Sequence, residues 1–213
     1  MEVELQFVYR GEGPLFVPVQ LADLELRRSS IEVLLDTYFD TPELVLRRAG
    51  CSLRVRRSDV AHRPRLTFKG PSRRHASVKR RQETEVELDS LPEQPEAMPL
   101  MLHRLGLDEA LRTCANWKLD ASLQPVGELR NRRSQHRYLH GLHRLDLTWD
   151  ELEFPTGPPQ TRLEVEARAE PAERLLQRAG RELEALFGDD LVAPERGKTR
   201  ELYERLYPEL LAA

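Results

Sequence analysis

The segment MEVELQF (residues 1–7) alternates between polar and apolar side chains from its second residue onward. In a β-strand, residues two apart point to the same face of the sheet. Glu2, Glu4 and Gln6 therefore share one side of the predicted strand, and the apolar residues between them share the other. The polar side of this strand is either exposed to solvent or part of a functional site. The charge patterns of the remaining strands distinguish these two interpretations.

The composition of the chain is typical of one globular domain. It has 213 residues, 39% hydrophobic and 32% charged, so we expect a single domain over residues 1–213 with a sizeable core. Neither a run of about 18 apolar residues nor a charged-then-apolar leader occurs, which predicts a cytoplasmic protein with no membrane partner. The net charge of −3 provides no overall basic field for nucleic acid. Cys51 and Cys114 lack metal-site spacing and are expected to be reduced, structural thiols.

Several further segments alternate with the period of two that is typical of half-buried strands. With the first strand, they are residues 2–8, 33–39, 52–57, 65–69, 81–88, 128–138, 142–149 and 161–168. Helical periodicity occurs in residues 19–28, 97–112, 171–187 and 198–206. This order predicts an α+β protein in which helices pack outside a largely antiparallel sheet. Closing the sheet into a barrel would remove its edges and could leave a polar lumen.

The predicted strands have heavily charged sides. The residues that share such a side are Arg54 and Arg56; Arg81, Glu83, Glu85 and Glu87; and Arg162, Glu164, Glu166 and Arg168. One such face alone is typical of a solvated sheet, where each ion pair contributes little. The recurrence of these faces, with cations and carboxylates sorted between strands, indicates a binding site. Grouped carboxylates bind hard divalent cations, and grouped arginines and lysines bind phosphate oxygens, so the pattern predicts a polyphosphate–metal site.

A series of short motifs runs along nearly the whole chain. They are EVELQ (2–6), DTYFDTPEL (36–44), LRVR (53–56), LTFK (66–69), RQETE (81–85), RNRR (130–133), LD (145–146), EVE (164–166) and Lys198 at the start of the last predicted helix. In this order the motifs resemble those of the CYTH superfamily, also called triphosphate tunnel metalloenzymes. Gln6 departs from the family's opening Glu-x-Glu-x-Lys, since it replaces the lysine. The resemblance implies a closed eight-stranded antiparallel β-barrel, or tunnel, with flanking α-helices, and Mg²⁺- or Mn²⁺-dependent chemistry on a triphosphate.

The resemblance also implies two groups of site residues. The carboxylates expected to bind metal are Glu2, Glu4, Asp146, Glu164, Glu166 and Glu85, with Glu87 as an alternative. The cations expected to bind the triphosphate are Arg54, Arg56, Lys69, Arg81, Arg130, Arg133 and Lys198. Within these groups, the residues expected to be catalytic are Glu2, Glu4, Arg56, Lys69 and Lys198.

Three of these assignments leave alternatives open. Strand alternation places Arg130 and Arg132 on one face and Arg133 on the other, so bringing both Arg130 and Arg133 into the tunnel requires a β-bulge or a strand end. Glu85 either binds metal or pairs with Arg81 in its own strand. The lysine of the last helix lies either in the site or on the surface near the helix start.

The leading functional hypothesis is metal-dependent hydrolysis of inorganic tripolyphosphate to pyrophosphate and phosphate, because no base- or thiazole-recognition motif is evident. Thiamine or nucleoside triphosphate is the alternative substrate. A noncatalytic polyphosphate- or nucleotide-binding module also stays open, since the neutral Gln6 cannot supply the charge of a lysine. A class IV adenylate cyclase is a weaker hypothesis, because its leader before Glu-x-Glu has no room here. The expected partner is a small-molecule triphosphate, bound to a monomer or homodimer.

Overall fold

The computed structural model describes residues 2–13, 15–75, 78–90, 98–116, 122–167 and 172–211, without the side chains of residues 2, 3, 73–75, 78–80, 210 and 211. The strands are β1 (Glu2–Tyr9), β2 (Gln20–Leu21), β3 (Leu24–Asp40), β4 (Ser52–Ser58), β5 (Arg65–Lys69), β6 (Arg73–His75), β7 (Val78–Arg81), β8 (Glu83–Glu87), β9 (Gln124–His140), β10 (His143–Glu153), β11 (Gln160–Ala167) and β12 (Leu191–Val192). The helices are α1 (Val45–Arg48), α2 (Met98–Arg104), α3 (Asp108–Ala115), α4 (Ala172–Phe187), the 3-10 turn η2 (Gly188–Asp190), α5 (Lys198–Leu206) and α6 (Pro208–Leu211).

The strands form a closed antiparallel barrel. Pairing runs in the order β6-β7-β1-β11-β10-β9-β3-β4-β5-β8. The two ends of this path belong to one long hairpin, because β6 continues the segment of β5 and only Gln82 separates β7 from β8. In that hairpin β5 pairs with β8 and β6 with β7, while β7 pairs on its other side with β1. Counting β5 with β6, and β7 with β8, as one strand each leaves eight strands in a ring, which confirms the predicted fold class.

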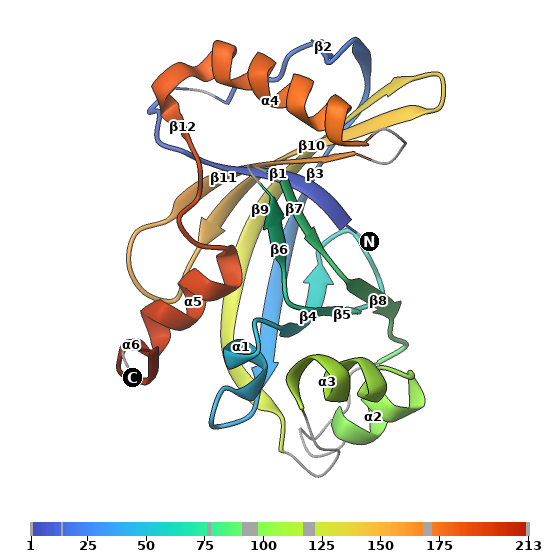
Figure 1. Ribbon diagram of the computed structural model, residues 1–213, viewed down its shortest axis with the longest axis vertical. Coiled ribbons are helices and arrows are strands. Elements are labelled where there is room, and N and C mark those ends of the chain that lie inside the picture. The colour runs from blue at the N-terminus through green and yellow to red at the C-terminus, as the bar shows by residue number, and fades with distance from the viewer. Residues whose placement is uncertain are drawn as a thin grey trace.

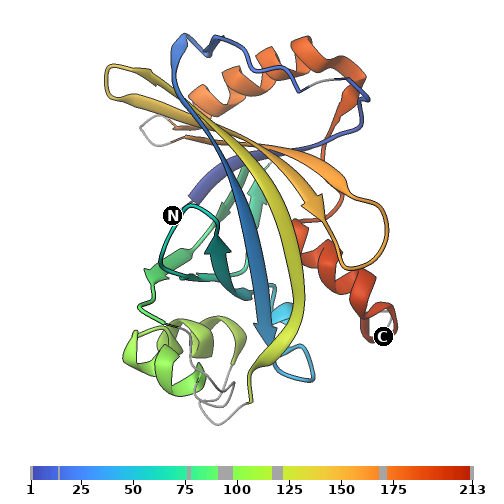
Figure 2. The same cartoon turned by 180° about the vertical axis from the view of Figure 1, so that it is seen from behind.

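The two longest strands, β3 and β9, lie side by side along one wall of the barrel (Figure 2). A hairpin connects β9 to β10, with His140 opposite His143 at its tip. Gly141 supplies the turn with a φ of 57°, a conformation that glycine adopts at little cost. The predicted strands at residues 128–138 and 142–149 therefore correspond to β9 and β10, and both are longer than the sequence pattern indicates.

Apolar side chains pack on the outer face of the barrel, in three clusters. Helix α4 covers β1, β10 and β11 above the barrel in Figure 1, burying Leu5, Trp149 and Leu163. Helices α1, α2 and α3 share a second cluster with β4 and β5, and α5 packs in a third against the ends of β3, β9 and β10. Because the apolar sides of the strands face the helices, their charged sides face the lumen. No helix of the described chain is long and apolar enough to cross a membrane.

The helix predicted over residues 19–28 is wrong. The structure has β2, a two-residue turn and the start of β3 in this segment, with Leu21 paired to Leu24. Ala22 and Asp23 take φ values of 51° and 64°, the left-handed conformation that a tight two-residue hairpin turn requires. The spacing of three between two buried leucines fits a helix face as well as a hairpin, which explains the error. The other predicted helices correspond to α2 with α3, α4 and α5.

Candidate functional site

The lumen of the barrel holds a cavity of about 610 Å³ lined mainly by charged side chains. The lining cations are Arg47, Arg54, Arg56, Arg63, Arg65, Lys69, Arg81, Arg133, Arg196, Lys198 and Arg200. The lining carboxylates are Glu4, Glu32, Glu83, Glu85, Glu164, Glu166 and Glu195. Cations outnumber carboxylates among these described side chains, and the cavity therefore suits an anion that carries several charges.

Carboxylates gather where β1 and β11 meet. Glu4 lies opposite Glu166 in the strand register, and Gln6 lies opposite Glu164. The Gln6 amide donates to Glu164 Oε1 at 2.7 Å, and Arg81 Nη2 donates to Glu4 Oε1 at 3.3 Å. This arrangement forms an acidic side of the lumen. Glu2 continues the same strand, but its side chain lies outside the described part of the chain.

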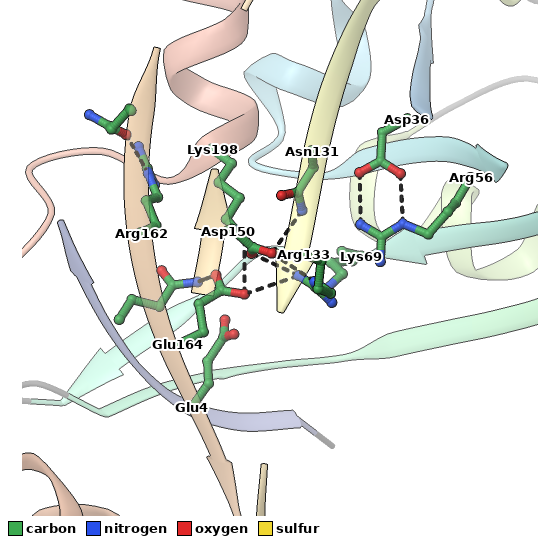
Figure 3. A network of polar contacts seen from close by, with 12 residues as sticks. Glu4, Asp36, Arg56, Lys69, Asn131, Arg133, Asp150, Arg162, Glu164 and Lys198 are labelled. Atoms are coloured by element: carbon green, nitrogen blue, oxygen red, sulfur yellow. Dashed lines mark hydrogen bonds and ion pairs between the residues drawn. The ribbon is translucent and has the colours of Figure 1, made fainter. Parts of the chain in front are cut away.

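A second group connects β9, β10, β11 and α5 (Figure 3). Asp150, fully buried, accepts two hydrogen bonds from Arg133 at 2.7 and 2.8 Å, one from Asn131 at 2.8 Å, and one from Lys198. Lys198 Nζ also lies 2.9 Å from Glu164 Oε2. The four charged side chains balance to neutrality, so two of the predicted substrate-binding cations are held in place before any ligand binds.

The pKa values of the two carboxyls in this group follow from these contacts. Burial by itself raises the pKa of each carboxyl, because it removes the charged form from water. For Asp150 the charges of Arg133 and Lys198 outweigh burial and hold its pKa well below the usual range. For Glu164, Lys198 and Arg133 similarly lower the pKa to about 2, against the opposing charge of Asp150. Both groups are therefore carboxylates at neutral pH.

On the opposite wall, Asp36 of β3 binds two arginines of β4. Its carboxylate accepts from Arg56 Nε and Nη2 at 2.7 Å each and from Arg54 Nη1 at 3.0 Å. Burial raises the pKa of Asp36, but Arg54 and Arg56 outweigh it and keep the pKa well below its usual value. Two cations share one carboxylate, which leaves this side of the cavity with excess positive charge.

Two arginines of the cavity wall retain unused donors. The Nε atoms of Arg47 and Arg54 are buried and have no hydrogen-bond partner among the described residues. A buried N–H without an acceptor is costly, so such groups usually have a partner in the functional state. Their position beside the cavity fits an anionic ligand that is held by arginine forks.

The structure places most of the predicted site residues around this one cavity. Those that line it are Glu4, Arg54, Arg56, Lys69, Arg81, Glu85, Arg133, Glu164, Glu166 and Lys198. The surface alternative for Lys198 is excluded, because its side chain is only 14% exposed. Glu85 contacts Thr67 and Arg65 rather than Arg81, at 3.3 and 3.5 Å.

The placement of Arg130 in the tunnel is wrong. No register shift separates Arg130 from Arg133 in the pairing of β9 with either neighbour, so the bulge that this placement required is absent. Strict alternation then turns Arg130 and Arg132 outward. Arg130 pairs with Glu153 at 2.8 Å, with its side chain 55% exposed.

Asp146 lies on the lumen face but not around the main cavity. It lines an adjoining hollow of about 440 Å³, which shares Arg65, Glu85 and Gln135 with the main cavity. Its buried carboxylate accepts a bond from Arg137 Nε at 2.9 Å and further bonds from Arg144. The metal role predicted for Asp146 is therefore not supported by its position, because two arginines occupy this carboxylate. Glu87 lines the same hollow.

Sequence reasoning missed Asp36, Asn131 and Asp150 as site residues. Asp36 stood in a quoted motif without a role. Asp150 lies four residues after Asp146, and alternation places both on one face of β10. That signal was available, but the four hydrogen bonds of Asp150 come from β9 and α5, two elements that the sequence does not align.

The carboxylates of β1 and β11 fit a divalent cation that shares its coordination with a ligand. No group of three His, Cys, Asp or Glu side chains within the described residues could hold a metal ion alone. Glu4 and Glu166 nevertheless line the same cavity as directly paired residues of the neighbouring strands β1 and β11. Mg²⁺ is usually bound by one or two carboxylates together with substrate oxygens and water, which this pair can satisfy.

The fold and this site define a class of protein, an antiparallel barrel whose lumen holds many cations together with a smaller group of carboxylates. A model of the CYTH domain matches residues 1–191. The chain therefore belongs to the CYTH family, which confirms the resemblance of its motifs. A search of curated proteins gave no match.

Solved structures share this fold. HpAC1 from Hippeastrum, a candidate adenylyl cyclase described as having a dominant triphosphatase activity, is 20% identical with a TM-score of 0.72, over 99% of each chain. PH1819 from Pyrococcus horikoshii OT3 is 21% identical with a TM-score of 0.55, over 96% of this chain and 99% of that one. A candidate adenylate cyclase from Bacillus halodurans is 18% identical with a TM-score of 0.54, over 81% of this chain and 83% of that one.

Proposed function

We propose that the tunnel binds a triphosphate together with a divalent cation and hydrolyses it. The observation that carries this proposal is the sorting of charge around one cavity. Cations from β4, β5, β7, β9 and α5 line it together with the Glu4 and Glu166 pair. A polyphosphate chain would bind these cations, and its metal ion would bind the two carboxylates. A simple anion would need only the cations.

The cations divide into two kinds of phosphate ligand. Arg54 and Arg56 present planar donor forks that suit two oxygens of one phosphoryl group. Lys69 and Lys198 act as compact point charges. Lys69 lies 3.1 Å from Glu83 and Lys198 lies between Asp150 and Glu164, so both ammonium groups are oriented before substrate binds. Such preorganisation is the main source of rate enhancement in phosphoryl transfer.

Glu4 and Glu166 would hold the metal ion. Glu2 is a further predicted ligand, and Glu164 and Glu85 are alternative ones. Mg²⁺ or Mn²⁺ bound there would supply charge neutralisation on the phosphates and a more acidic water. In the reaction, a water oxygen forms a bond to a terminal phosphorus while the bridging P–O bond breaks. The attacking water gives its proton to solvent water, and orthophosphate and pyrophosphate leave. Arg54, Arg56 and Lys69 stabilise the charge on the transferred group.

Inorganic tripolyphosphate is the substrate that this lining favours. Tyr38, which is 2% exposed, is the single aromatic side chain among the described residues that line the cavity. A nucleobase or a thiazolium ring would be expected to stack on exposed aromatic surface. Thiamine and nucleoside triphosphates are therefore the second choice. The triphosphatase activity described for HpAC1, which shares the fold, supports this reaction over cyclisation.

Phosphate release from tripolyphosphate, ATP and thiamine triphosphate, with Mg²⁺ or Mn²⁺, tests the proposal. We expect metal-dependent turnover that is fastest with tripolyphosphate. Arg133→Gln should lower kcat/KM by about a hundredfold, since it breaks a buried charge pair of the site. Arg132→Gln is the matched control, because this neighbouring arginine faces outward and pairs with Glu151.

Two other outcomes would contradict the proposal. Tight binding of tripolyphosphate without turnover, across several divalent ions, would establish the noncatalytic binding module. Formation of cyclic AMP and pyrophosphate from ATP would establish a cyclase. We further propose a single domain over residues 1–213 in a cytoplasmic monomer or homodimer, without nucleic-acid partners.

A further inference from the structure

Arg162 is a buried cation of β11 that the proposed mechanism does not use. Alternation places it on the same strand face as Glu164 and Glu166, yet its side chain is only 2% exposed. A buried guanidinium is costly unless its donors are satisfied. The acceptors of these donors therefore indicate what Arg162 does.

Three acceptors of Arg162 lie among the described residues. Its Nε donates to Gln160 Oε1 at 2.5 Å on the same strand, and its Nη1 donates to the carbonyl oxygen of Arg196 at 3.0 Å. Its Nη2 donates to Glu201 Oε2. Two of these three acceptors belong to the segment that leads into α5 and to the first turns of that helix. Arg162 thus connects β11 to the beginning of α5.

Besides the ion pairs of Lys198 with Asp150 and Glu164, the other side-chain contacts from α5 to the barrel act on its second half. Tyr203 Oη donates to Asp40 Oδ2 at 3.2 Å. Arg205 Nη1 donates to the carbonyl oxygens of Thr156 and Pro158, at 2.9 Å each. Lys198, the cation that α5 brings to the cavity, lies at the opposite end of the helix. It stands between the two positions that Arg162 binds.

We propose that Arg162 is a positioning residue, which fixes the start of α5 on β11 and thereby sets Lys198 in the cavity. The inference rests on the proposed function only for its effect on turnover. If Arg162 is neutralised, the contacts of Tyr203 and Arg205 still hold the end of α5. The first turns then lose the two attachments that Arg162 makes from β11, and only the ion pairs of Lys198 itself still hold this end of the helix, so the position of the ammonium in the cavity is less firmly fixed.

Hydrogen exchange of the metal-free protein tests the positioning without any substrate. In Arg162→Gln, we expect faster exchange in the peptide covering residues 196–202 and unchanged exchange in the peptide covering residues 203–209. Arg178→Gln is the matched control, because Arg178 is an exposed arginine of α4 that pairs with Asp23 and Glu182. Equal protection of both peptides in Arg162→Gln and wild type would overturn the proposal.

Kinetics with Mg²⁺ and tripolyphosphate supply the second readout. Arg162→Gln should lower kcat/KM by about tenfold or more. In a Lys198→Gln background the same change should lower kcat/KM by no more than about twofold, because the effects of coupled residues are not additive. Arg162→Lys should restore little, since one ammonium cannot reach three acceptors in a fork geometry. Additive losses would assign Arg162 a merely structural role.

Glu201→Gln keeps the test valid if Arg162→Gln does not fold. It weakens the same contact from the α5 side, so the exchange of residues 196–202 should rise there as well. If wild type shows no turnover with any triphosphate, the proposed function fails, and the exchange data still decide the positioning role independently. Unchanged exchange in Glu201→Gln would count against that role.

Discussion

Gln6 is the residue at which this chain departs from the opening motif of its family. Its side chain lies in the cavity and donates a hydrogen bond to Glu164, which also receives Lys198. The amide therefore replaces a cation by a neutral donor that keeps the Glu164 carboxylate oriented. The departure changes the charge of the acidic side without leaving Glu164 unpartnered.

Gln6→Lys should restore the missing charge and tighten triphosphate binding. We expect KM for Mg²⁺-tripolyphosphate to fall about fivefold, because a charged hydrogen bond is worth roughly 1 kcal/mol more than a neutral one. Gln6→Met is the matched control, since it removes the donor without adding charge. A KM that rises in Gln6→Lys, or that changes equally in both variants, would contradict this explanation.

Asp36 makes the stability of the protein depend on pH in a defined direction. Its folded-state pKa lies below the usual 3.8. A depressed carboxyl pKa contributes stability that is fully present above the unfolded pKa and is lost as the pH falls towards the folded pKa. The window of this contribution therefore begins near pH 3.8 and extends to lower pH.

Asp36→Asn should lower the free energy of unfolding by about 3 kcal/mol at pH 7, since it leaves two buried arginines without their carboxylate. Urea unfolding at several pH values measures this difference from wild type. The difference should be constant at neutral pH and should shrink as the pH falls below 3.8, because Asp36 of the unfolded wild type then binds a proton that the folded carboxylate, with its lower pKa, does not yet bind. A difference that grows in acid would show the opposite linkage.

Helix α5 is the element that completes the site, and Asp40 couples it to the rest of the fold. The carboxylate of Asp40 accepts backbone N–H groups of Thr41, Leu46 and Arg47, at 2.8 to 2.9 Å, as well as the hydroxyl of Tyr203. One buried carboxylate thereby orders the start of α1 and the second half of α5. Burial raises the pKa of Asp40, while these hydrogen bonds oppose the increase.

Two variants should separate the contribution of the Tyr203 hydrogen bond from that of the whole group of bonds to Asp40. Tyr203→Phe removes one neutral donor, and we expect it to lower the free energy of unfolding by about 1 kcal/mol. Asp40→Asn weakens every bond in the group and leaves an amide N–H among donors, so we expect a loss of about 3 kcal/mol. Chemical denaturation of both variants measures which of them loses more free energy of unfolding. A larger loss in Tyr203→Phe would contradict the central role of Asp40.

At the scale of the whole molecule, the barrel differs from an ordinary domain in having charged rather than apolar side chains at its centre. Its apolar clusters lie outside, under the helices, and its lumen carries charges of both signs. Such a lumen is stabilised by pairing, as around Asp36 and Asp150, and by any ligand that supplies missing charge. Ligand binding should therefore affect the stability of the entire barrel.

Mg²⁺ and tripolyphosphate together should raise the melting temperature. At a ligand concentration of about 100 Kd the stabilisation is roughly 2.7 kcal/mol, equivalent to about 5–10 °C for a protein of this size. Differential scanning calorimetry should show this shift for wild type and a much smaller one for Glu166→Gln. Glu151→Gln, on the outer face of β10, is the matched control. Equal shifts in both variants would remove Glu166 from the site.

Much of this architecture follows from local sequence pattern. Alternation alone fixes which side chains share a strand face, because the period of a strand is two, and it sorted Arg54 with Arg56 and Glu164 with Glu166 correctly. The same rule turned Arg130 outward, and the expected bulge was an unnecessary exception. The segment at residues 19–28 failed because two leucines three residues apart satisfy both a helix and a hairpin.

What the sequence by itself determined is the charge on each strand face, the order of the family motifs and the departure at Gln6. Only the tertiary structure decided which of these charges meet. Lys198 reaches Glu164, Arg162 holds the start of α5, and Asp150 gathers partners from β9 and α5. These pairings depend on strand register and helix packing between segments far apart in the chain, and no local propensity specifies such distances.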